Sequence, residues 1–521
     1  MSAVASMMND FCRVLIDVER NGIKIDLDAL NELEREYTEE YKELENKLEI
    51  LARDSLGDTP FNLSSNDDLS MIIYSRKPIC KKTWANIFNL GSEMVNGVRK
   101  IKKPRSINKK ELKNLIRDNT RIQFKTKAAQ CTVCKGGGKT KKLLKSGLYS
   151  ERPTKCRNCA GVGVLYTHTN EIAGFKQLPK STNDLSAHGY KCNKDKLQEL
   201  VRTADGEAKD FLKAMVRFNA VAHYLSSFIK GIRGNVGRDG VLHTQFMQCV
   251  TATGRLSSRN PNFHNQPRGG TFPIRKVVIS RWDKGSITEA DYAQLEFRVA
   301  ASLAKDYTAI ADINNGRDVH QYTADTLTQN GQPTDRQDAK HHTFKPLYGG
   351  TSGTKAEKAY YKQFQDRYNY IRGWHKTLMR LALNYKVLKL PTGRIYRFPW
   401  VRQTAHGLIS DATKIKNYPV QGFATADIVP MATISLYRLY KQHNLKSVII
   451  NEVHDSIVTD TYPGEEDTVA ALKIQAMTGV VDELKDKFNY NFLVPLKVEV
   501  KNGINWLDMS VTAEGESKQN T

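Results

Sequence analysis

Two aspartates in this 521-residue sequence, 164 positions apart, have the surroundings of a metal-binding pair. Asp291 follows the strand-like segment 287–290, and Asp455 lies between two apolar segments, 448–453 and 456–459. Apolar segments joined by two polar residues predict a β-hairpin whose turn presents those residues. If the strand before Asp291 pairs beside that hairpin, the carboxylates converge as oxygen ligands for two Mg²⁺ ions, which can stabilise the attacking and leaving oxygens of phosphoryl transfer. Taken alone, each aspartate is more simply explained as a cap or turn residue.

Four residues of RQDAKHHTFKPLYGG repeat at a spacing of four, namely Arg336, Lys340, Phe344 and Tyr348. On a helix each step of four turns by about 400°, so the four side chains share one face. Arg and Lys can grip a triphosphate, while Phe and Tyr can stack on a base and its sugar. The alternative is a solvated helix with a half-buried aromatic edge.

The stretch TATGRLSSRNPNFHNQP (251–267) is rich in Gly, Ser, Asn and Pro, which predicts a loop. From such a loop, Arg255, Asn262 and Asn265 could contact a phosphate-sugar backbone or minor-groove edges. The loop carries little information without the other segments.

Four of the eight cysteines form the pattern C-x₂-C-x₂₁-C-x₂-C, and each pair is followed by Gly-x-Gly. Glycines allow the tight turns that bring four thiolates around one tetrahedral Zn²⁺. In a long intracellular chain, paired CxxC indicates metal before disulfide. The pattern is similar to the zinc repeats of DnaJ-type chaperones, and two repeats make one structural site from Cys131, Cys134, Cys156 and Cys159.

The elements that must position these residues are indicated by hydrophobic periodicity. Apolar residues recur every three or four positions over 26–53, which predicts a long amphipathic helix, and a second helical region spans 193–232. Beyond residue 254 the chain is mixed α/β, with helices over 293–304 and from about 335. The tail VTAEGESKQNT (511–521) is expected to be disordered.

The net charge of +23 suggests a polyanionic partner such as nucleic acid. Most of it is local, because residues 76–160 carry 24 Lys and Arg against 4 Asp and Glu, which leaves only +3 for the rest of the chain. We therefore expect residues 76–186 to be a basic insert in a balanced protein. The sequence has no apolar run of membrane-spanning length and no signal or transit peptide, so an intracellular, cytoplasmic protein is expected, in the host cell if the chain is phage-encoded.

Together these segments resemble family A DNA polymerases, the family of bacterial DNA polymerase I and many phage replicative enzymes. DYAQLEFRV is similar to motif A, RQDAKHHTFKPLYGG to motif B and NEVHDSIV to motif C, and 251–267 is similar to the stretch that precedes motif A. The resemblance covers 12–75 and about 190–507. It implies an α/β right-hand polymerase with palm, fingers and thumb, and with the small zinc-binding insert in the thumb.

The resemblance also implies a role for each matching residue. Asp291 and Asp455, with the Tyr292 carbonyl, would hold the magnesium ions. Arg336 and Lys340 would bind the incoming triphosphate, and Lys340 would protonate the departing pyrophosphate. The remaining contacts to the nucleotide would come from Phe344, Tyr348, Glu296, His320 and Gln294, with Glu296 excluding a ribose 2′-hydroxyl. Contacts to primer and template would come from Arg255, Asn417, Gln421, His454, Asn262, Asn265 and Arg298.

Two residues depart from the family pattern. Ser456 follows Asp455 where the family often has an acidic residue, so a third carboxylate is missing at that position. Pro346 lies within motif B, where it removes a hydrogen bond to the His342 carbonyl and is expected to kink the helix near Tyr348.

The implied organisation places the start of palm and thumb before the insert and alternates palm and fingers after it. Asp17 and Glu19 imitate an exonuclease DxE, but VERNGIKID matches the polymerase opening, so no intrinsic 3′–5′ proofreading is expected. The predicted parts are 1–75 (palm and thumb start), 76–186 (insert), 187–250 (thumb), 251–334 (palm), 335–410 (fingers), 411–510 (palm) and 511–521 (tail).

The expected activity is DNA-directed DNA polymerisation in replication or repair by a monomer that uses primer-template DNA and dNTPs. A processivity factor and a separate exonuclease are the further partners considered, and no membrane partner is expected. The alternatives are a single-subunit RNA polymerase-like enzyme and a non-catalytic DNA-binding scaffold. The insert is expected to track DNA phosphates, with binding of a partner protein as its alternative.

Overall fold

The computed structural model describes residues 2–95, 98–141, 148–404 and 407–518. The chain divides into two compact units, one of Met1–Leu33 with Ser226–Thr521 and the other of Glu34–Leu225. Each unit has its own hydrophobic core.

The first unit is built on a five-stranded antiparallel sheet with the strand order β18-β19-β15-β20-β21. Central strand β15 is flanked by the motif C hairpin on one side and by β20 on the other. All six residues of β19 are buried, as expected for an apolar strand inside a sheet. The strands are β15 (Ser286–Tyr292), β18 (Val448–Val453), β19 (Ser456–Thr461), β20 (Lys497–Gly503) and β21 (Met509–Glu516).

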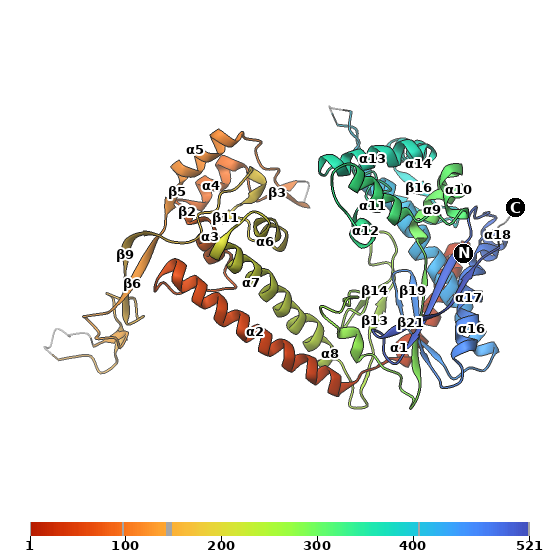
Figure 1. Cartoon of the computed structure of the whole chain (residues 1–521), viewed down its shortest axis with the longest axis horizontal. Helices are drawn as coiled ribbons and strands as arrows, with labels where there is room; N and C mark the ends of the chain where they lie inside the picture. Colours follow the sequence, from red (N-terminus) through yellow and green to blue (C-terminus); the bar gives the residue numbers. More distant parts are fainter. Residues whose placement is uncertain (1, 96–97, 142–147, 405–406, 519–521) are drawn as a thin grey trace. The chain divides into compact units, whose positions relative to one another are not determined.

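Helices cover this sheet, so the unit has a layer of helices against a layer of strands (Figure 1). Helix α17 contacts β15, β20 and β21, and α1 contacts β18. The helices are α1 (Ala3–Asn21), α8 (Lys230–Arg233), α9 (Leu295–Ala304), α10 (Tyr307–Asn314), α11 (Val319–Gln329), α12 (Arg336–Thr343), α13 (Lys355–Arg367), α14 (Asn369–Tyr385), α15 (Ala412–Gly422), α16 (Val429–Gln442), α17 (Glu466–Thr478) and α18 (Val480–Phe488). Short paired strands complete the unit: β1 (Ile23–Lys24) with β12 (Val241–Leu242), β13 (Gln245–Met247) with β14 (Ser257–Arg259), and β16 (Val387–Lys389) with β17 (Ile395–Arg397).

In the second unit, two long helices pack against each other and against a small lobe. The ring of Tyr41 lies 4.6 Å from that of Phe218, and Arg217 forms two hydrogen bonds with Glu40. The helices are α2 (Leu27–Leu56), α3 (Asn66–Tyr74), α4 (Lys81–Phe88), α5 (Lys109–Asn119), α6 (Lys194–Val201) and α7 (Gly206–His223). The lobe strands pair as β2 (Arg76–Pro78) with β5 (Thr120–Ile122), β3 (Ser92–Val95) with β4 (Val98–Ile101), and β10 (Leu185–Ser186) with β11 (Gly189–Tyr190).

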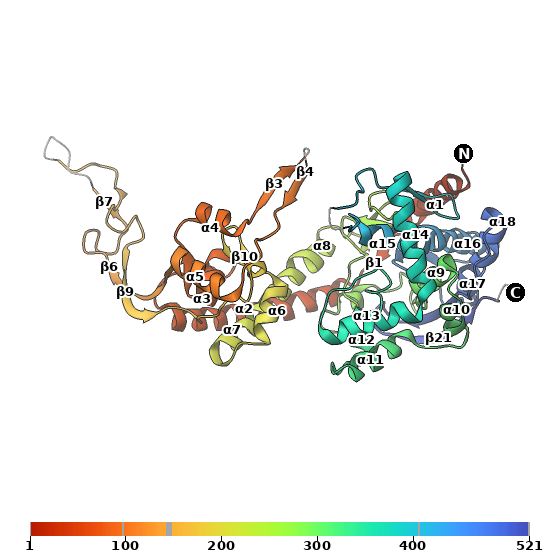
Figure 2. The same cartoon turned by 90° about the horizontal axis from the view of Figure 1, so that it is seen from above.

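The predicted insert has two structurally different parts. Trp84, Phe88, Leu112 and Ile116 belong to the same buried core as α2 and α7, so this part is integral to the unit. Strands β6 (Phe124–Gln130) and β9 (Val164–Ile172) instead form a two-stranded arm that carries β7 (Lys139–Thr140), β8 (Thr154–Lys155) and the four cysteines (Figure 2).

The predicted helices over 26–53 and 193–232 and the motif C hairpin are confirmed. The disordered tail was a wrong expectation, because residues 511–516 belong to β21, which pairs with β20 along seven positions. Ala513 packs against the core of the unit, which explains why the segment is held. The last three tail residues, 519–521, lie outside the described residues.

Candidate active site

The two aspartates predicted to converge lie at one edge of the five-stranded sheet of the first unit. Asp291 is the penultimate residue of β15, where it faces Ser456 of β19 in register. The backbone N–H of Tyr292 donates to the Asp455 carbonyl at 3.2 Å, which joins the two segments directly. His454 adopts the left-handed conformation (φ 61°) in the hairpin turn, so the turn reverses within two residues and presents Asp455 beside β15.

The electrostatics of this edge favour a bound cation. Burial raises the pKa of Asp291 well above its usual range, and the Asp455 carboxylate beside it adds to the rise. Burial also raises the pKa of Asp455. Asp291 Oδ1 is buried and has no hydrogen-bond partner among the described residues, while Oδ2 lies 3.8 Å from Arg268. Two crowded carboxylates with an unpaired buried oxygen are a donor set that fits divalent metal ions of the Mg²⁺ type.

A third carboxylate that the sequence analysis did not identify lies on the same face. Glu289 precedes Asp291 by two positions in β15, so both side chains point to one side of the sheet. Its Oε1 accepts a hydrogen bond from Ser456 Oγ at 2.8 Å, and its Oε2 lies 3.9 Å from buried Arg275. The two-residue spacing in ITEADY indicates that Glu289 and Asp291 share a face of the strand. The contact between Glu289 and Ser456, however, depends on the strand register.

The triphosphate-binding candidates lie around α11 and α12. Asp318 caps α11 and also accepts a hydrogen bond from Arg336 Nε at 2.6 Å. His320 is buried, and its Nδ1 lies 3.0 Å from Thr343 Oγ1; burial lowers the pKa of His320. The ring of Phe344 meets His320 edge-on at 5.3 Å, and Lys340 is exposed on the same helix as Arg336.

The expectation of one kinked helix through motif B is wrong. Helix α12 ends at Thr343, and residues 344–349 form successive turns. Pro346 has no N–H to continue the helix, and the chain turns with hydrogen bonds from Lys345 to His342 and from Gly349 to Pro346. Arg336 and Lys340 therefore share a helical face, but Phe344 and Tyr348 do not extend it.

Tyr348 nevertheless reaches the first turn of α9, the helix that follows β15. Its hydroxyl donates to the carboxylate of Glu296 in the first turn of α9. Gln421 also hydrogen-bonds Glu296 and counteracts the rise in its pKa that burial causes. Motifs A and B and helix α15 thus meet at Glu296.

The predicted DNA contacts fall into different environments. Arg255 Nη2 lies 3.0 Å from His454 Nδ1; Arg255 is half-buried, and His454 is exposed in the hairpin turn. Asn417 lies on α15 one turn before Gln421, half-buried, and Gln294 caps α9 with a left-handed backbone.

In the preceding loop, Asn262 is a structural residue as well as an exposed one. Its Oδ1 accepts hydrogen bonds from the backbone of His264 and Asn265 and from Ser258 Oγ. Asn265 is exposed.

Arg298 contradicts the expectation of a DNA contact. Arg298 is only 8% exposed, and its side chain donates to the carbonyls of Ala293 and Pro495 inside the first unit. Arg298 therefore fixes the start of α9 against the chain that leads into β20.

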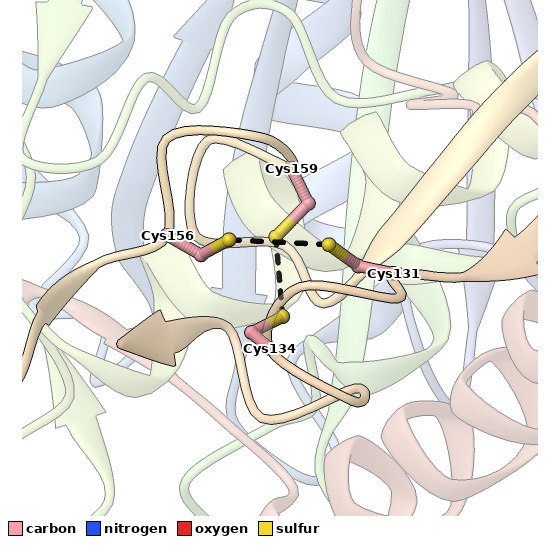
Figure 3. A group of neighbouring side chains, drawn as sticks. All are labelled: Cys131, Cys134, Cys156 and Cys159. Atoms are coloured by element: carbon pink, nitrogen blue, oxygen red, sulfur yellow. Dashed lines mark hydrogen bonds between the residues drawn. The ribbon is translucent and has the colours of Figure 1, made fainter. Parts of the chain in front are cut away.

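The four cysteines of the arm converge as predicted, with all sulfurs within 4.8 Å of one another (Figure 3). Cys131 and Cys156 sulfurs are 3.9 Å apart, and those of Cys134 and Cys159 are 3.6 Å apart. Four ligands at about 2.3 Å from a tetrahedral Zn²⁺ have sulfurs about 3.8 Å apart, so the cluster fits that ion. Backbone hydrogen bonding lowers the pKa of Cys131 to about 6, whereas burial raises the pKa of Cys134 to about 11.

No helix within the described residues is both long and apolar enough to cross a bilayer. A sequence profile described as DNA polymerase family A matches residues 167–508. DNA polymerase I of Lactococcus lactis is 27% identical over 353 residues, which cover 64% of this chain and 38% of that protein. DNA polymerase I of Caldicellulosiruptor bescii is 30% identical over 353 residues, which cover 64% of this chain and 39% of that protein.

Among solved structures, the POL domain of Pol1 from M. smegmatis in complex with DNA primer-template and dNTP aligns with a TM-score of 0.63. The alignment covers 96% of this chain and 70% of that one at 20% identity, so it supports the fold. The match to the bacterial relatives spans about two fifths of their length.

Proposed function

Because this chain belongs to DNA polymerase family A, we propose that it is a DNA-directed DNA polymerase that adds dNTPs to a primer 3′ end by two-metal phosphoryl transfer. The observation that carries the proposal is the hydrogen bond from Tyr292 N–H to the Asp455 carbonyl, which keeps two carboxylates of distant segments side by side. Primer-template DNA and dNTPs are the proposed substrates.

In this proposal Asp291, Asp455 and the Tyr292 carbonyl would hold two Mg²⁺ ions, which would supply positive charge to offset the negative charge that develops in phosphoryl transfer. Arg336 and Lys340 bind the triphosphate, and the primer hydroxyl attacks the α-phosphate in line. The bond from the α-phosphorus to the oxygen of the β-phosphate breaks, and the hydroxyl proton passes to solvent. Lys340 then donates a proton to the leaving pyrophosphate. The contact between Arg336 and Asp318 is exposed and is exchanged for phosphate when the nucleotide binds.

Glu296 is the proposed sugar selector. Held by Tyr348 and Gln421, its side chain has little freedom to leave the space that a ribose 2′-hydroxyl would need. Glu296→Ala should raise ribonucleotide incorporation relative to dNTP incorporation by about a hundredfold, since a buried polar obstacle is removed. Comparing the two kcat/KM values also tests the RNA polymerase-like alternative, which predicts no preference for dNTPs in the unaltered chain.

Asp455→Asn tests the catalytic assignment itself. Primer extension should fall by at least about a thousandfold, while primer-template binding in a fluorescence anisotropy assay stays within about twofold. The matched control is Asp283→Asn, an exposed residue beyond the opposite end of β15. If Asp455→Asn extended primers normally, the assignment of the active site would be wrong and the non-catalytic DNA-binding scaffold would be favoured.

We also propose that the arm is pinned by one structural Zn²⁺ and tracks duplex phosphates to raise processivity. Residues 124–172 carry 10 Lys and Arg against 2 Asp and Glu, which suits a polyanion. Phe124 and Ile172 are cross-strand partners, so residues 125–171 can be replaced by a short turn without removing core residues. This deletion should flatten the salt dependence of DNA binding and shorten products, and an unchanged slope would favour a protein partner.

We propose that this chain has no intrinsic proofreading site at Asp17 and Glu19. The Asp17 carboxylate accepts a hydrogen bond from Tyr437, and the Glu19 carboxylate accepts one from the backbone of Phe246. Both acids are therefore engaged in polar contacts within the first unit. Mismatched primers should not be trimmed, and trimming that Asp17→Ala abolished would contradict the proposal.

We further propose that the protein is a monomer that acts in the cytoplasm, in replication or repair. Its further partners would be a separate processivity factor or exonuclease. Sedimentation of the purified chain and its extension length with and without lysate fractions test these points.

A further inference from the structure

The lobe of the second unit contains an apolar groove that the polymerase function does not use. It has a volume of about 610 Å³ and lies between α5, strands β2 and β5, and residues 178–180. Its apolar wall consists of Leu112 and Ile116, which are nearly fully buried, and of Ile122 and Leu178, which are 38% and 63% exposed. This volume is in the range of pockets that hold ligands or bulky side-chain anchors.

The rim of the groove is cationic. Five of its lining residues are basic, and no carboxylate lines it among the described residues: Arg76, Lys109, Lys113, Arg117 and Lys180. Lys109, Lys113 and Arg117 succeed one another at every fourth position of α5, so they form one stripe along the helix. Like charges at this spacing repel one another along a helix, and an anionic ligand would relieve that repulsion.

The existing partners of these cations leave them available. Arg117 contacts Asp118 and Lys180 contacts Glu199, and both pairs are largely exposed, so they contribute little and exchange readily. Lys109 and Lys113 have no acidic partner in the part of the chain that the structure describes.

We propose that this groove binds an acidic peptide segment of a partner protein that carries one or two bulky apolar side chains. The apolar side chains would cover Leu112, Ile116 and Leu178, and the carboxylates would meet the stripe of α5. The stripe runs over nine helical residues, from Lys109 to Arg117, with a rise of about 12 Å, which an extended peptide covers with about four residues.

The combination of surfaces distinguishes this occupant from DNA. A phosphodiester backbone satisfies the cations but offers no apolar group large enough to fill the groove, so Leu178 would stay in water. A second copy of this chain is disfavoured by its surplus of +23. The inference does not rest on the polymerase activity, because all its residues lie within the second unit.

The test uses the full-length protein and a fluorescein-labelled eight-residue peptide of five aspartates, two leucines and one phenylalanine, read by anisotropy. Binding in the micromolar range is expected, and a peptide with serine at the three apolar positions should bind about tenfold more weakly, the value of one or two buried apolar side chains. Leu178→Ser and Lys113→Glu should each weaken the first peptide about tenfold. Their matched controls, Ile101→Ser and Lys100→Glu, change exposed residues outside the groove and should bind normally.

Three outcomes would overturn the proposal. Absence of binding to the unaltered protein removes it directly. Equal affinity for both peptides, or no effect of Leu178→Ser, would show only a diffuse cationic surface. Displacement of the peptide by a 20-base-pair duplex, with Leu178→Ser and Lys113→Glu losing duplex affinity in parallel, would assign the groove to DNA instead.

Discussion

The edge of the first unit that carries Asp291 and Asp455, the proposed catalytic edge, and the basic lobe of the second unit concentrate charge by different means. Asp291, Glu289 and Glu499 are placed on one sheet face by strand register, since Asp291 faces Glu499 in β20 and Glu289 is two positions earlier. The cations of the lobe are brought together by helix periodicity and composition, and they stay exposed. A few partly buried acids create a strong local field that salt screens weakly, whereas many exposed cations create a diffuse field that salt screens well.

The largest expected effect comes from neutralising one carboxylate of the acidic edge. Asp291→Asn should reduce extension by at least about a thousandfold and, in chelator, raise the melting temperature by about 2 °C or more. The raised pKa of Asp291 means that its ionised form destabilises the fold, so stability is present at low pH and is lost as pH rises through the folded pKa. Thermal denaturation at pH 8 with Asp283→Asn as control measures this, and a lower melting temperature would contradict the account.

A smaller effect is expected from Glu289→Gln. The change keeps the hydrogen bond from Ser456 Oγ but removes the charge beside Asp291, so Mn²⁺ binding measured by electron paramagnetic resonance should weaken about tenfold. Ser456→Ala, which keeps the charge, should have less effect. Equal loss in both variants would show that the hydrogen bond matters and the charge does not.

The basic side is tested by Cys156→Ser. One ligand of four is lost, so metal content by mass spectrometry should fall to a small fraction and protease cleavage within 125–171 should accelerate. Single-nucleotide incorporation should stay within about twofold, because the arm lies in the other unit. Cys80→Ser, at an exposed cysteine outside the cluster, is the control.

The smallest effect on catalysis is expected at Glu452, a fully buried acid that accepts a hydrogen bond from Thr433 Oγ1 at 2.6 Å. Burial raises the pKa of Glu452 to about 8 from 4.5. Its contribution to stability is therefore present below about pH 4.5 and is lost as pH rises toward 8. Glu452→Gln should flatten the dependence of melting temperature on pH over that window, and an unchanged slope would refute the shift.

Local pattern predicted those parts of the site that depend on local structure. The motif C hairpin is encoded by two apolar runs around a two-residue turn, and the cysteine cluster by spacing, so both could be anticipated. The contact of Ser456 with Glu289 depends on pairing between segments 167 residues apart. The spacing of four in motif B predicted one continuous helix, but α12 ends at Thr343 because Pro346 cannot continue its hydrogen bonding.

The segment 509–516 likewise could not be predicted from local pattern alone. Its residues have little strand signal of their own beyond the alternation of Val511 and Ala513, and they become a strand through pairing with β20. Arg298 likewise resembles a surface residue in the motif and is buried because two backbone carbonyls lie within reach.

The hydrogen bond between Tyr292 and Asp455 joins segments that are made at different times, so it also affects the order in which the protein folds during translation. The catalytic edge needs β15, the hairpin and β20, so it cannot assemble until residues near 503 have left the ribosome. The lobe and the arm, complete by residue 225, can fold much earlier. Enzyme activity in a coupled translation reaction should therefore lag well behind protease resistance of the second unit, and nascent chains truncated before β20 should be inert.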